Sequence, residues 1–241
     1  MVNVPRFHRL SADWRRFYAE NGYCILTGIW RAEECDALVA RAHQLPKAQS
    51  GDFKPVLQPQ EQAPEFLAAM RKPELTQVVE SLVGGTASGL QIEFFFGHPG
   101  TTGFTPHQDN YFVQGGAGTF LSTWTALTDI ASDMGALYVF PCSHRFDLLP
   151  VRETAISASP HQDPNAVARE TVLPQSIAEP VALTMSKGET VILDGNLVHG
   201  SRDNKSDRFR HALLCTYIRK GEPFREGYSA KRSPIELHPP N

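Results

Sequence analysis

Residues 104–112 form the stretch Phe-Thr-Pro-His-Gln-Asp-Asn-Tyr-Phe, and the rest of the chain can be interpreted around it. On an extended strand, side chains two residues apart point to the same face, so His107 and Asp109 would present an imidazole and a carboxylate toward one point. Such a pair supplies two ligands of a metal site. A His-x-Asp pair is common by chance, so the surrounding sequence has to decide whether a metal binds.

A candidate third ligand, His199, follows the apolar run at residues 190–193. Two histidines and one carboxylate on one side of a metal leave positions open on the other side, which is the arrangement of non-haem iron(II) oxygenases. The same ligands also suit zinc, so a zinc-dependent hydrolase-like enzyme is one alternative. A non-catalytic, cupin-like binding protein is another.

Arg210 is a charged residue next to a predicted apolar strand. If residues 211–218 form a strand, Arg210 shares a face with Ala212 and Leu214, which are apolar. A charge that points into a barrel must find a partner, because an unpaired buried ion is costly. The alternative is that Arg210 precedes the strand and reaches solvent, as we expect for Arg208.

Several further segments accompany these residues in a recognisable order. The segments are Asn-Gly-Tyr at 21–23, His-Gln-Asp at 107–109, Thr-Trp-Thr-Ala-Leu at 123–127, Gly-Ala-Leu-Tyr-Val-Phe-Pro-Cys-Ser-His at 135–144, Lys-Gly-Glu-Thr-Val at 187–191, His-Gly-Ser at 199–201 and Arg210. Together they resemble the phytanoyl-CoA dioxygenase family, the iron(II)- and 2-oxoglutarate-dependent oxygenases. One departure is Cys142, which stands where the family usually has glycine in a Pro-Gly-Ser-His turn.

The resemblance implies a ligand set and a reaction. His107, Asp109 and His199 would bind iron(II), and Arg210 would bind the distal carboxylate of the cosubstrate 2-oxoglutarate, with O2 as the other reactant. Further positions that match cosubstrate-contacting residues are Trp124, Gln91, Ser201 and Lys54, although Lys54 suits an exposed surface nearly as well. Halogenating relatives replace the carboxylate ligand by a small residue, so Asp109 implies hydroxylation, or another oxidation without halide, with release of succinate and carbon dioxide.

Substrate contacts are expected at the mouth of the barrel near His107. Asn110, Tyr111 and Phe112 are placed to form one wall of a small-molecule site. The other wall is expected from residues 145–178, an irregular, proline-containing segment that we interpret as a lid loop. Arg152 and Arg169 in this segment are candidates to meet an acidic group. No compact Lys/Arg cluster suits the phosphates of coenzyme A, so we predict a smaller organic metabolite.

The predicted fold is mainly β with supporting helices (α+β), a double-stranded β-helix or cupin-like jelly roll packed by N-terminal helices. The expected strands lie at residues 90–96, 107–113, 120–127, 136–140, 181–185, 189–193 and 211–218. A serine cap with a glycine end predicts a helix at about 12–21, and apolar residues at i, i+3, i+4 and i+7 predict one at about 32–45. Proline starts predict helices at 64–71 and 73–83. We expect one domain over 1–241, with helical support at about 1–88, a jelly-roll core at about 89–219 and a loosely packed tail at 220–241.

Whole-chain properties narrow the function classes. The chain has 241 residues, which fits one domain, and its formal net charge of −3 gives no electrostatic reason to bind nucleic acid or an anionic membrane. Its four cysteines lack Cys-x-x-Cys spacing and are expected to be reduced thiols. We find no apolar run of signal-peptide or membrane-span length and therefore expect a cytoplasmic enzyme with a small-molecule substrate. The oligomeric state stays open.

Overall fold

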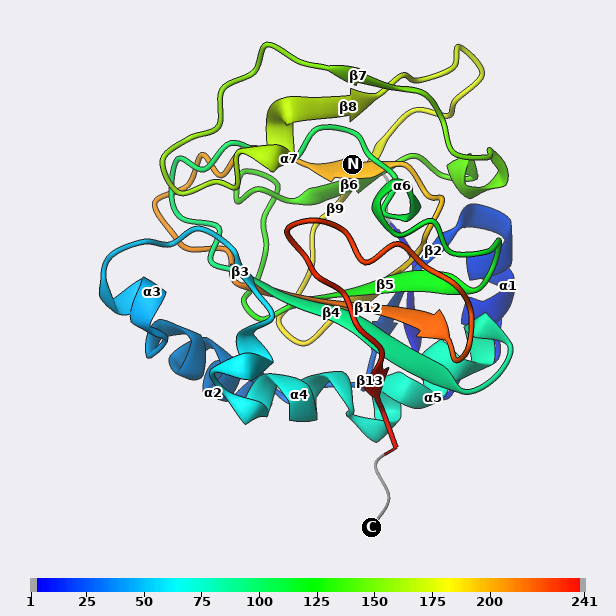
Figure 1. The fold of residues 1–241 in the computed structure, drawn as a ribbon, viewed down its shortest axis with the longest axis horizontal. Coiled ribbons are helices and arrows are strands. Elements are labelled where there is room, and N and C mark those ends of the chain that lie inside the picture. The colour runs from blue at the N-terminus through cyan, green and yellow to red at the C-terminus, as the bar shows by residue number, and fades with distance from the viewer. Residues whose placement is uncertain (1–3, 239–241) are drawn as a thin grey trace.

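The computed structural model describes residues 4–238 and contains two facing β-sheets with helices against one of them (Figure 1). In the larger sheet the strand order is β1-β2-β10-β5-β12-β4-β13, and β3 also pairs with β4. Its strands are β1 (Arg6–His8), β2 (Tyr23–Thr27), β3 (Val56–Leu57), β4 (Ala87–Phe95), β5 (Phe120–Ala126), β10 (Thr190–Asp194), β12 (Ala212–Arg219) and β13 (Ile235–Glu236). The predicted fold class, mainly β with supporting helices, is confirmed.

The smaller sheet has the order β11-β6-β9, and a separate hairpin joins β7 to β8. These strands are β6 (Leu137–Val139), β7 (Val151–Glu153), β8 (Arg169–Thr171), β9 (Val181–Leu183) and β11 (His199–Ser201). The helices are α1 (Asp13–Asn21), α2 (Ala32–His43), α3 (Pro46–Gln49), α4 (Pro64–Met70), α5 (Pro73–Val83), α6 (Asn110–Val113) and α7 (Asn165–Ala168), with short 3₁₀ turns at Pro59–Glu61 and Ser143–Arg145. None of the helices in the described part of the chain is long and apolar enough to cross a membrane.

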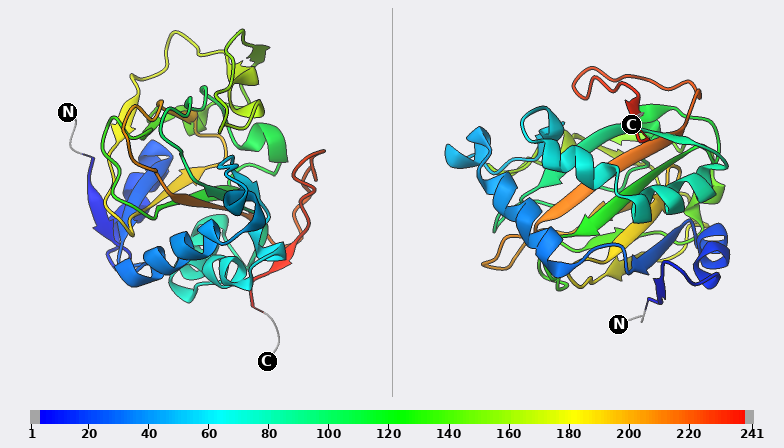
Figure 2. Two further views of the ribbon diagram at one scale, coloured as in Figure 1. Left: turned by 90° about the vertical axis from the view of Figure 1, so that its left-hand side faces the viewer. Right: turned by 90° about the horizontal axis from the view of Figure 1, so that it is seen from below.

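The helices form where local sequence signals are strong. Helix α5 begins with Pro73 in its first turn and ends at Gly84, whose φ of 73° is left-handed and therefore favours glycine. Its stripe of Leu75, Val78 and Val79 is buried. Figures 1 and 2 show α2, α4 and α5 lying across the outer face of the larger sheet, so that face is closed to solvent.

A second apolar layer lies between the two sheets and surrounds the candidate site. Trp124 on β5 and Val191 on β10 share one cluster with Leu137 and Val139 of the smaller sheet. Successive side chains of β5 point to opposite faces of the sheet. Leu121 therefore belongs to the cluster under the helices, whereas Trp124 faces the smaller sheet. The space between the sheets therefore brings side chains of both sheets together.

The strand predicted at residues 107–113 is wrong. His107 forms a single antiparallel bridge with His199, and the chain then turns at Asp109, whose φ of −58° and ψ of −35° are helical, into α6. The reason is tertiary: the Asn110 amide N–H donates to the Gly195 carbonyl at 2.8 Å, which turns the chain away from the sheet. Smaller differences are that α2 ends at His43 and that Pro46 starts α3 instead of only closing the preceding helix.

Two segments with weak sequence patterns are more ordered than their sequence indicates. Residues 145–178 contain the β7–β8 hairpin and α7. The chain after Lys220 crosses the opening between the sheets and rejoins the larger sheet as β13, as the red trace in Figure 1 shows. Arg225 fastens this tail, because its side chain donates to the Phe112 carbonyl at 3.1 Å and its amide N–H donates to the Val113 carbonyl at 2.6 Å.

Candidate metal and cosubstrate site

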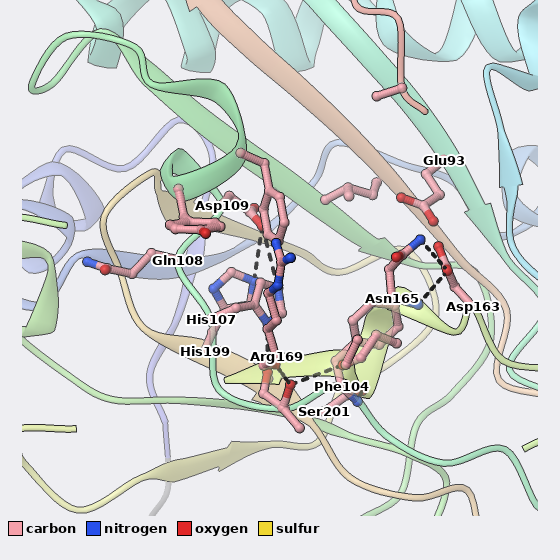
Figure 3. Close-up of a pocket in the computed structure, with 18 of the residues that line it drawn as sticks. Glu93, Phe104, His107, Gln108, Asp109, Asp163, Asn165, Arg169, His199 and Ser201 are labelled. Atoms are coloured by element: carbon pink, nitrogen blue, oxygen red, sulfur yellow. Dashed lines mark hydrogen bonds and ion pairs between the residues drawn. The ribbon is translucent and has the colours of Figure 1, made fainter. Parts of the chain in front are cut away.

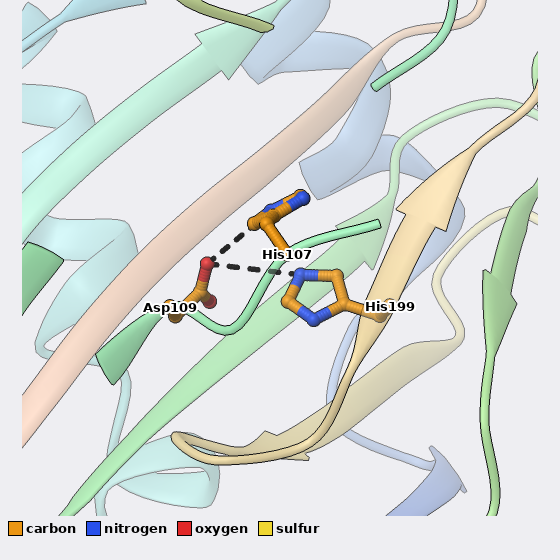
Figure 4. A group of neighbouring side chains, drawn as sticks. All are labelled: His107, Asp109 and His199. Atoms are coloured by element: carbon orange, nitrogen blue, oxygen red, sulfur yellow. Dashed lines mark ion pairs between the residues drawn. The ribbon is translucent and has the colours of Figure 1, made fainter. Parts of the chain in front are cut away.

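His107, Asp109 and His199 meet in space although the chain separates them. Their candidate ligand atoms all lie within 4.8 Å of one another. Asp109 Oδ1 is 3.6 Å from His107 Nε2 and 3.7 Å from His199 Nε2, so the carboxylate faces both imidazoles (Figure 4). The short bridge between His107 and β11 brings the two histidines together, and the turn into α6 swings Asp109 toward them.

Backbone groups fix which nitrogen of each imidazole faces the site. His107 Nδ1 lies 2.7 Å from the Thr105 carbonyl, and His199 Nδ1 lies 3.0 Å from the Leu197 carbonyl. A carbonyl only accepts, so each Nδ1 carries the proton and each Nε2 is left free as a potential ligand. Such partners orient metal-binding histidines in many proteins.

The carboxylate is held in its ionised form. Burial would raise the pKa of Asp109, but His199, His107 and the Ser122 hydroxyl lower it more, and the pKa lies well below its usual value. Ser122 Oγ donates to Asp109 Oδ2 at 2.5 Å. Burial also lowers the pKa of His199 to about 4, so this imidazole is neutral near pH 7. An anionic carboxylate beside a neutral imidazole suits a divalent cation.

Gln108, between two of these residues, points away from them and ties the segment to its surroundings. Its Nε2 donates to the Asn196 carbonyl at 2.7 Å, and its Oε1 accepts from the Leu149 amide at 2.8 Å. The side chain is buried. Gln108 therefore links the segment of His107 to the loop before His199 and to the start of the lid segment.

Arg210 lines the same cavity as the three candidate ligands. It is buried, and its Nη1 donates to the Gly135 carbonyl at 2.9 Å. Its Cζ lies 5.4 Å from the Trp124 ring centroid. Burial lowers the pKa of the guanidinium to about 10, so it stays charged near pH 7. Among residues 4–238 its Nε has no hydrogen-bond partner, which leaves a buried cation with unused capacity to bind an anion.

The remaining sequence-predicted residues divide into two groups. Those that line the cavity are Trp124, Gln91, Ser201, Tyr111 and Phe112. Ser201 Oγ accepts from the Phe104 amide at 2.9 Å, which leaves its O–H as a donor toward the cavity. Lys54 and Asn110 do not line the cavity; Asn110 instead donates through Nδ2 to Asn196 Oδ1 at 2.9 Å, because its side chain organises the turn that ends in Gly115.

Sequence reasoning missed several residues that line the cavity. Glu93 on β4, Asp163 in the lid segment, and Arg225 and Arg232 in the tail are among them. Glu93 has a signal that was available: it is the one charged residue in the apolar run at 90–96. The others have no local signal, because only the folding of the lid and tail over the sheets brings them here.

The cavity between the sheets has a volume of about 1210 Å³ and is lined by both sheets, the lid segment and the tail (Figure 3). Arg152, which we expected to meet an acidic ligand, is not among the lining residues and pairs with Glu170, with 2.5 Å between Nη2 and Oε1. Arg169 lines the cavity and is exposed. His144 does not line the cavity; its Nε2 lies 3.3 Å from the carbonyl of Ala19 in α1.

Comparisons with known proteins agree with this site. A sequence model of the family "Phytanoyl-CoA dioxygenase (PhyH)" matches residues 18–212. "Phytanoyl-CoA dioxygenase, peroxisomal" of Bos taurus is 24% identical over 243 residues, which covers 86% of this chain and 68% of that one. "Phytanoyl-CoA dioxygenase 1" of Oryza sativa is 31% identical over 132 residues, which covers 54% of this chain but only 44% of the rice protein.

Solved structures show the same fold. The carbocyclase SnoK from nogalamycin biosynthesis, described as non-heme and alpha ketoglutarate dependent, has a TM-score of 0.71 and 21% identity, covering 96% of this chain and 94% of its own. EvdO2 from Micromonospora carbonacea, complexed with 2-oxoglutarate, has a TM-score of 0.71 and 17% identity, covering 100% and 97%. Since the family match spans residues 18–212, the chain belongs to the phytanoyl-CoA dioxygenase family of iron(II)- and 2-oxoglutarate-dependent oxygenases.

Proposed function

We propose that this non-haem iron(II)- and 2-oxoglutarate-dependent dioxygenase hydroxylates a small organic molecule in the cavity between its two sheets. The observation that supports this best is the presence in one cavity of the His107, Asp109 and His199 cluster and of Arg210, a buried cation with a free donor. Iron and 2-oxoglutarate, when bound, supply the oxidation of a substrate C–H bond by O2, with succinate and carbon dioxide as coproducts.

The chain's own residues fit these two groups. The Nε2 atoms of His107 and His199 and the Asp109 carboxylate would hold iron on one side only, which leaves the cavity side open. Arg210 would bind the far carboxylate of 2-oxoglutarate, because a planar guanidinium suits a carboxylate. Gln91 Oε1 and Thr216 Oγ1 are further buried cavity atoms without partners among the described residues.

The decisive experiment needs no substrate. Protein purified without oxygen is analysed for metals, reconstituted with iron(II), and incubated with O2 and 2-oxoglutarate while succinate is measured. We expect slow succinate formation that depends on iron. Firmly bound zinc without succinate formation would support a hydrolase-like enzyme instead, and neither metal nor succinate would support a cupin-like binding protein.

Hydroxylation is the finer part of the proposal. Asp109 occupies the position that halogenating relatives leave small, so no halide should enter the product. SnoK, a carbocyclase, has the same fold, so the fold alone does not specify hydroxylation. A coupled product that gains one oxygen atom from O2 would support hydroxylation, and a chlorinated or ring-closed product would contradict it.

A further inference from the structure

Two carboxyl groups lie in the cavity on the side away from the candidate metal ligands. Glu93 comes from β4 and Asp163 from the lid segment, and both line the cavity. Figure 3 shows both on one side of the view, with Asp109 and the two histidines on the other, and Asp163 acts on Glu93 electrostatically. Neither acid is needed to hold iron or 2-oxoglutarate in the proposed function, so their role is open.

The hydrogen-bond partners leave both acids with unused oxygen atoms. Glu93 accepts one hydrogen bond, from Gln91 Nε2 at 3.3 Å. Asp163 Oδ1 accepts from the amide and the side chain of Asn165 at 2.8 and 3.0 Å. No other side-chain donor of residues 4–238 reaches Glu93. An oxygen of each carboxyl therefore remains for a ligand in the cavity.

The surrounding charges favour a cation at this place. The charged groups that act on Glu93 are Asp163, Asp109 and Arg232. Only Arg232, which also lines the cavity, is positive. Its Nη1 is directed to the Phe112 and Glu226 carbonyls at 3.4 and 3.3 Å, and its Nε has no hydrogen-bond partner among the described residues. Among the described residues, neither Glu93 nor Asp163 is within ion-pair distance of a basic side chain. Glu93 is buried and Asp163 is partly exposed, and a buried carboxylate near a second acid is unfavourable in its ionised form without a cation.

The pKa of Glu93 is consistent with the low positive charge around it. Burial first, and then the nearby Asp163 and Asp109, raise the pKa of Glu93 to about 8. A bound cation would reverse the effect, because an opposite charge within a few ångströms favours the ionised carboxylate.

We infer that the substrate of the proposed oxygenase presents a protonated amine to Glu93 and Asp163, while its carbon skeleton extends across the cavity toward His107, Asp109 and His199. This inference rests on the proposed function, and it names the chemical class of the substrate. Tyr111 and Phe112 would line the path of the skeleton. Because Asp163 belongs to the lid segment, the amine would also hold the lid against β4.

The other ligand classes are less well supported by the contacts. A carboxylate ligand at this end would meet the acids Glu93 and Asp163. The basic lining residue that acts on Glu93 is Arg232, so a carboxylate is the competing probe. A neutral hydroxyl could donate to the free oxygens but would not offset the negative charge. The two classes are therefore used as competing probes in the test.

The test measures binding to the protein loaded with iron(II) and 2-oxoglutarate without oxygen. Straight-chain primary amines from butylamine to octylamine are titrated calorimetrically, together with the alcohols and carboxylates of the same lengths. We expect the best amine to bind at least about tenfold more tightly than the matching alcohol, as one charge-assisted contact in a buried site provides. The matching carboxylate should bind more weakly than the alcohol.

Variants locate the contact. Glu93→Gln keeps the shape and the contact with Gln91 but removes the charge, and it should lose about tenfold in amine affinity while alcohol affinity stays unchanged. Asp163→Asn should show a smaller loss, because this residue is partly exposed. Glu179→Gln removes the same charge from an exposed position outside the cavity and should bind the amine as the natural protein does.

Equal binding of amines and alcohols by the natural protein, tighter binding of carboxylates, or an unchanged amine affinity in both Glu93→Gln and Asp163→Asn overturns the inference. Iron content and uncoupled succinate formation are measured on the same samples. If iron content and succinate formation are normal, only the inference of an amine substrate is wrong. If the natural protein shows neither, the proposed function itself is wrong.

Discussion

The candidate ligands show how single residues acquire their function from their neighbours. The Thr105 and Leu197 carbonyls set the tautomers of His107 and His199, and Ser122 orients the Asp109 carboxylate. Each partner is a backbone group or a short side chain, so it has little freedom to move. The arrangement is therefore preorganised for a cation before one binds.

Removing one ligand should abolish metal binding. His199→Ala leaves two candidate ligands, and we expect loss of bound iron and of uncoupled succinate formation, measured by metal analysis and a succinate assay. The matched control is His144→Ala, since His144 contacts the Ala19 carbonyl rather than the site and should keep its iron. Full activity in His199→Ala would remove the proposed ligand set.

Arg210 should govern the requirement for 2-oxoglutarate. Arg210→Ala removes a buried, charge-assisted contact, so the 2-oxoglutarate concentration for half-maximal succinate formation should rise by on the order of a hundredfold. The control Arg208→Ala changes an exposed arginine two residues earlier and should have little effect. A normal requirement in Arg210→Ala would mean that another group binds the carboxylate.

At the scale of elements, the turn at Ser143–Arg145 begins at a strained residue. Cys142 has a φ of 66°, which is left-handed, and it occupies the position where the family usually has glycine. A residue with a Cβ pays about 1–2 kcal/mol there, whereas glycine does not. The turn thus keeps its geometry without its usual residue, at some cost in stability.

Glycine at this position should stabilise the protein. Cys142→Gly relieves the strain but adds freedom to the unfolded chain, so we expect a net gain of up to ~1 kcal/mol in the free energy of unfolding. Urea unfolding measures it. Cys142→Ala is the control, because alanine keeps the Cβ and should bring no gain. Equal stability of the two variants would show that the left-handed turn costs nothing here.

The lid segment is held by a few side-chain contacts. Gln162 is buried, its Nε2 donates to the Thr102 carbonyl, and its Oε1 accepts from the Asp163 amide at 2.8 Å. Thr105 on the facing segment donates to the Ala166 carbonyl at 3.1 Å. Deleting residues 160–169 would therefore disturb the approach to His107 as well as the lid, so a point change is the cleaner test.

Gln162→Ala should loosen the lid selectively. We expect faster amide hydrogen exchange over residues 153–169, with iron content and uncoupled succinate formation retained, because the contact lies outside the ligand cluster. Gln175→Ala, at an exposed position, is the control. Unchanged exchange in Gln162→Ala would indicate that the β7–β8 hairpin alone holds the segment.

At the scale of the whole molecule, the buried acid Glu93, which lines the cavity, makes the free energy of unfolding depend on pH. The pKa of Glu93 is raised from its ordinary value of 4.5 to about 8 by burial and by Asp163 and Asp109. Between these values the unfolded chain releases this proton while the folded protein keeps it. The contribution of Glu93 to stability is therefore largest below about pH 4.5 and is lost as the pH rises toward 8.

Glu93→Gln should remove this dependence. For metal-free protein at about pH 8 we expect the free energy of unfolding of the variant to exceed that of the natural protein by on the order of a few kcal/mol, with a higher unfolding temperature. At about pH 5 the two should differ little. Thermal unfolding over this pH range measures it, with the exposed Glu179→Gln as the control. A constant difference across the range would show that Glu93 does not titrate in this window.

The sequence by itself determined those features that depend on neighbouring residues or on a fixed spacing. Pro73 and Gly84 set the ends of α5, because proline and a left-handed glycine act locally. Apolar runs set most strands. His107, Asp109 and Arg210 could be named as site residues from spacing and family resemblance, and the structure gathers all three in one cavity.

Only the tertiary structure decided the features that depend on contacts between distant segments. The amide of Asn110 bonds to Gly195, and this contact makes a helical turn of residues that resemble a strand. Lys54 falls outside the cavity, whereas Glu93 and Asp163 meet in it from β4 and the lid. No local pattern encodes such meetings, because long-range packing, not propensity, sets the free energy of bringing these side chains together.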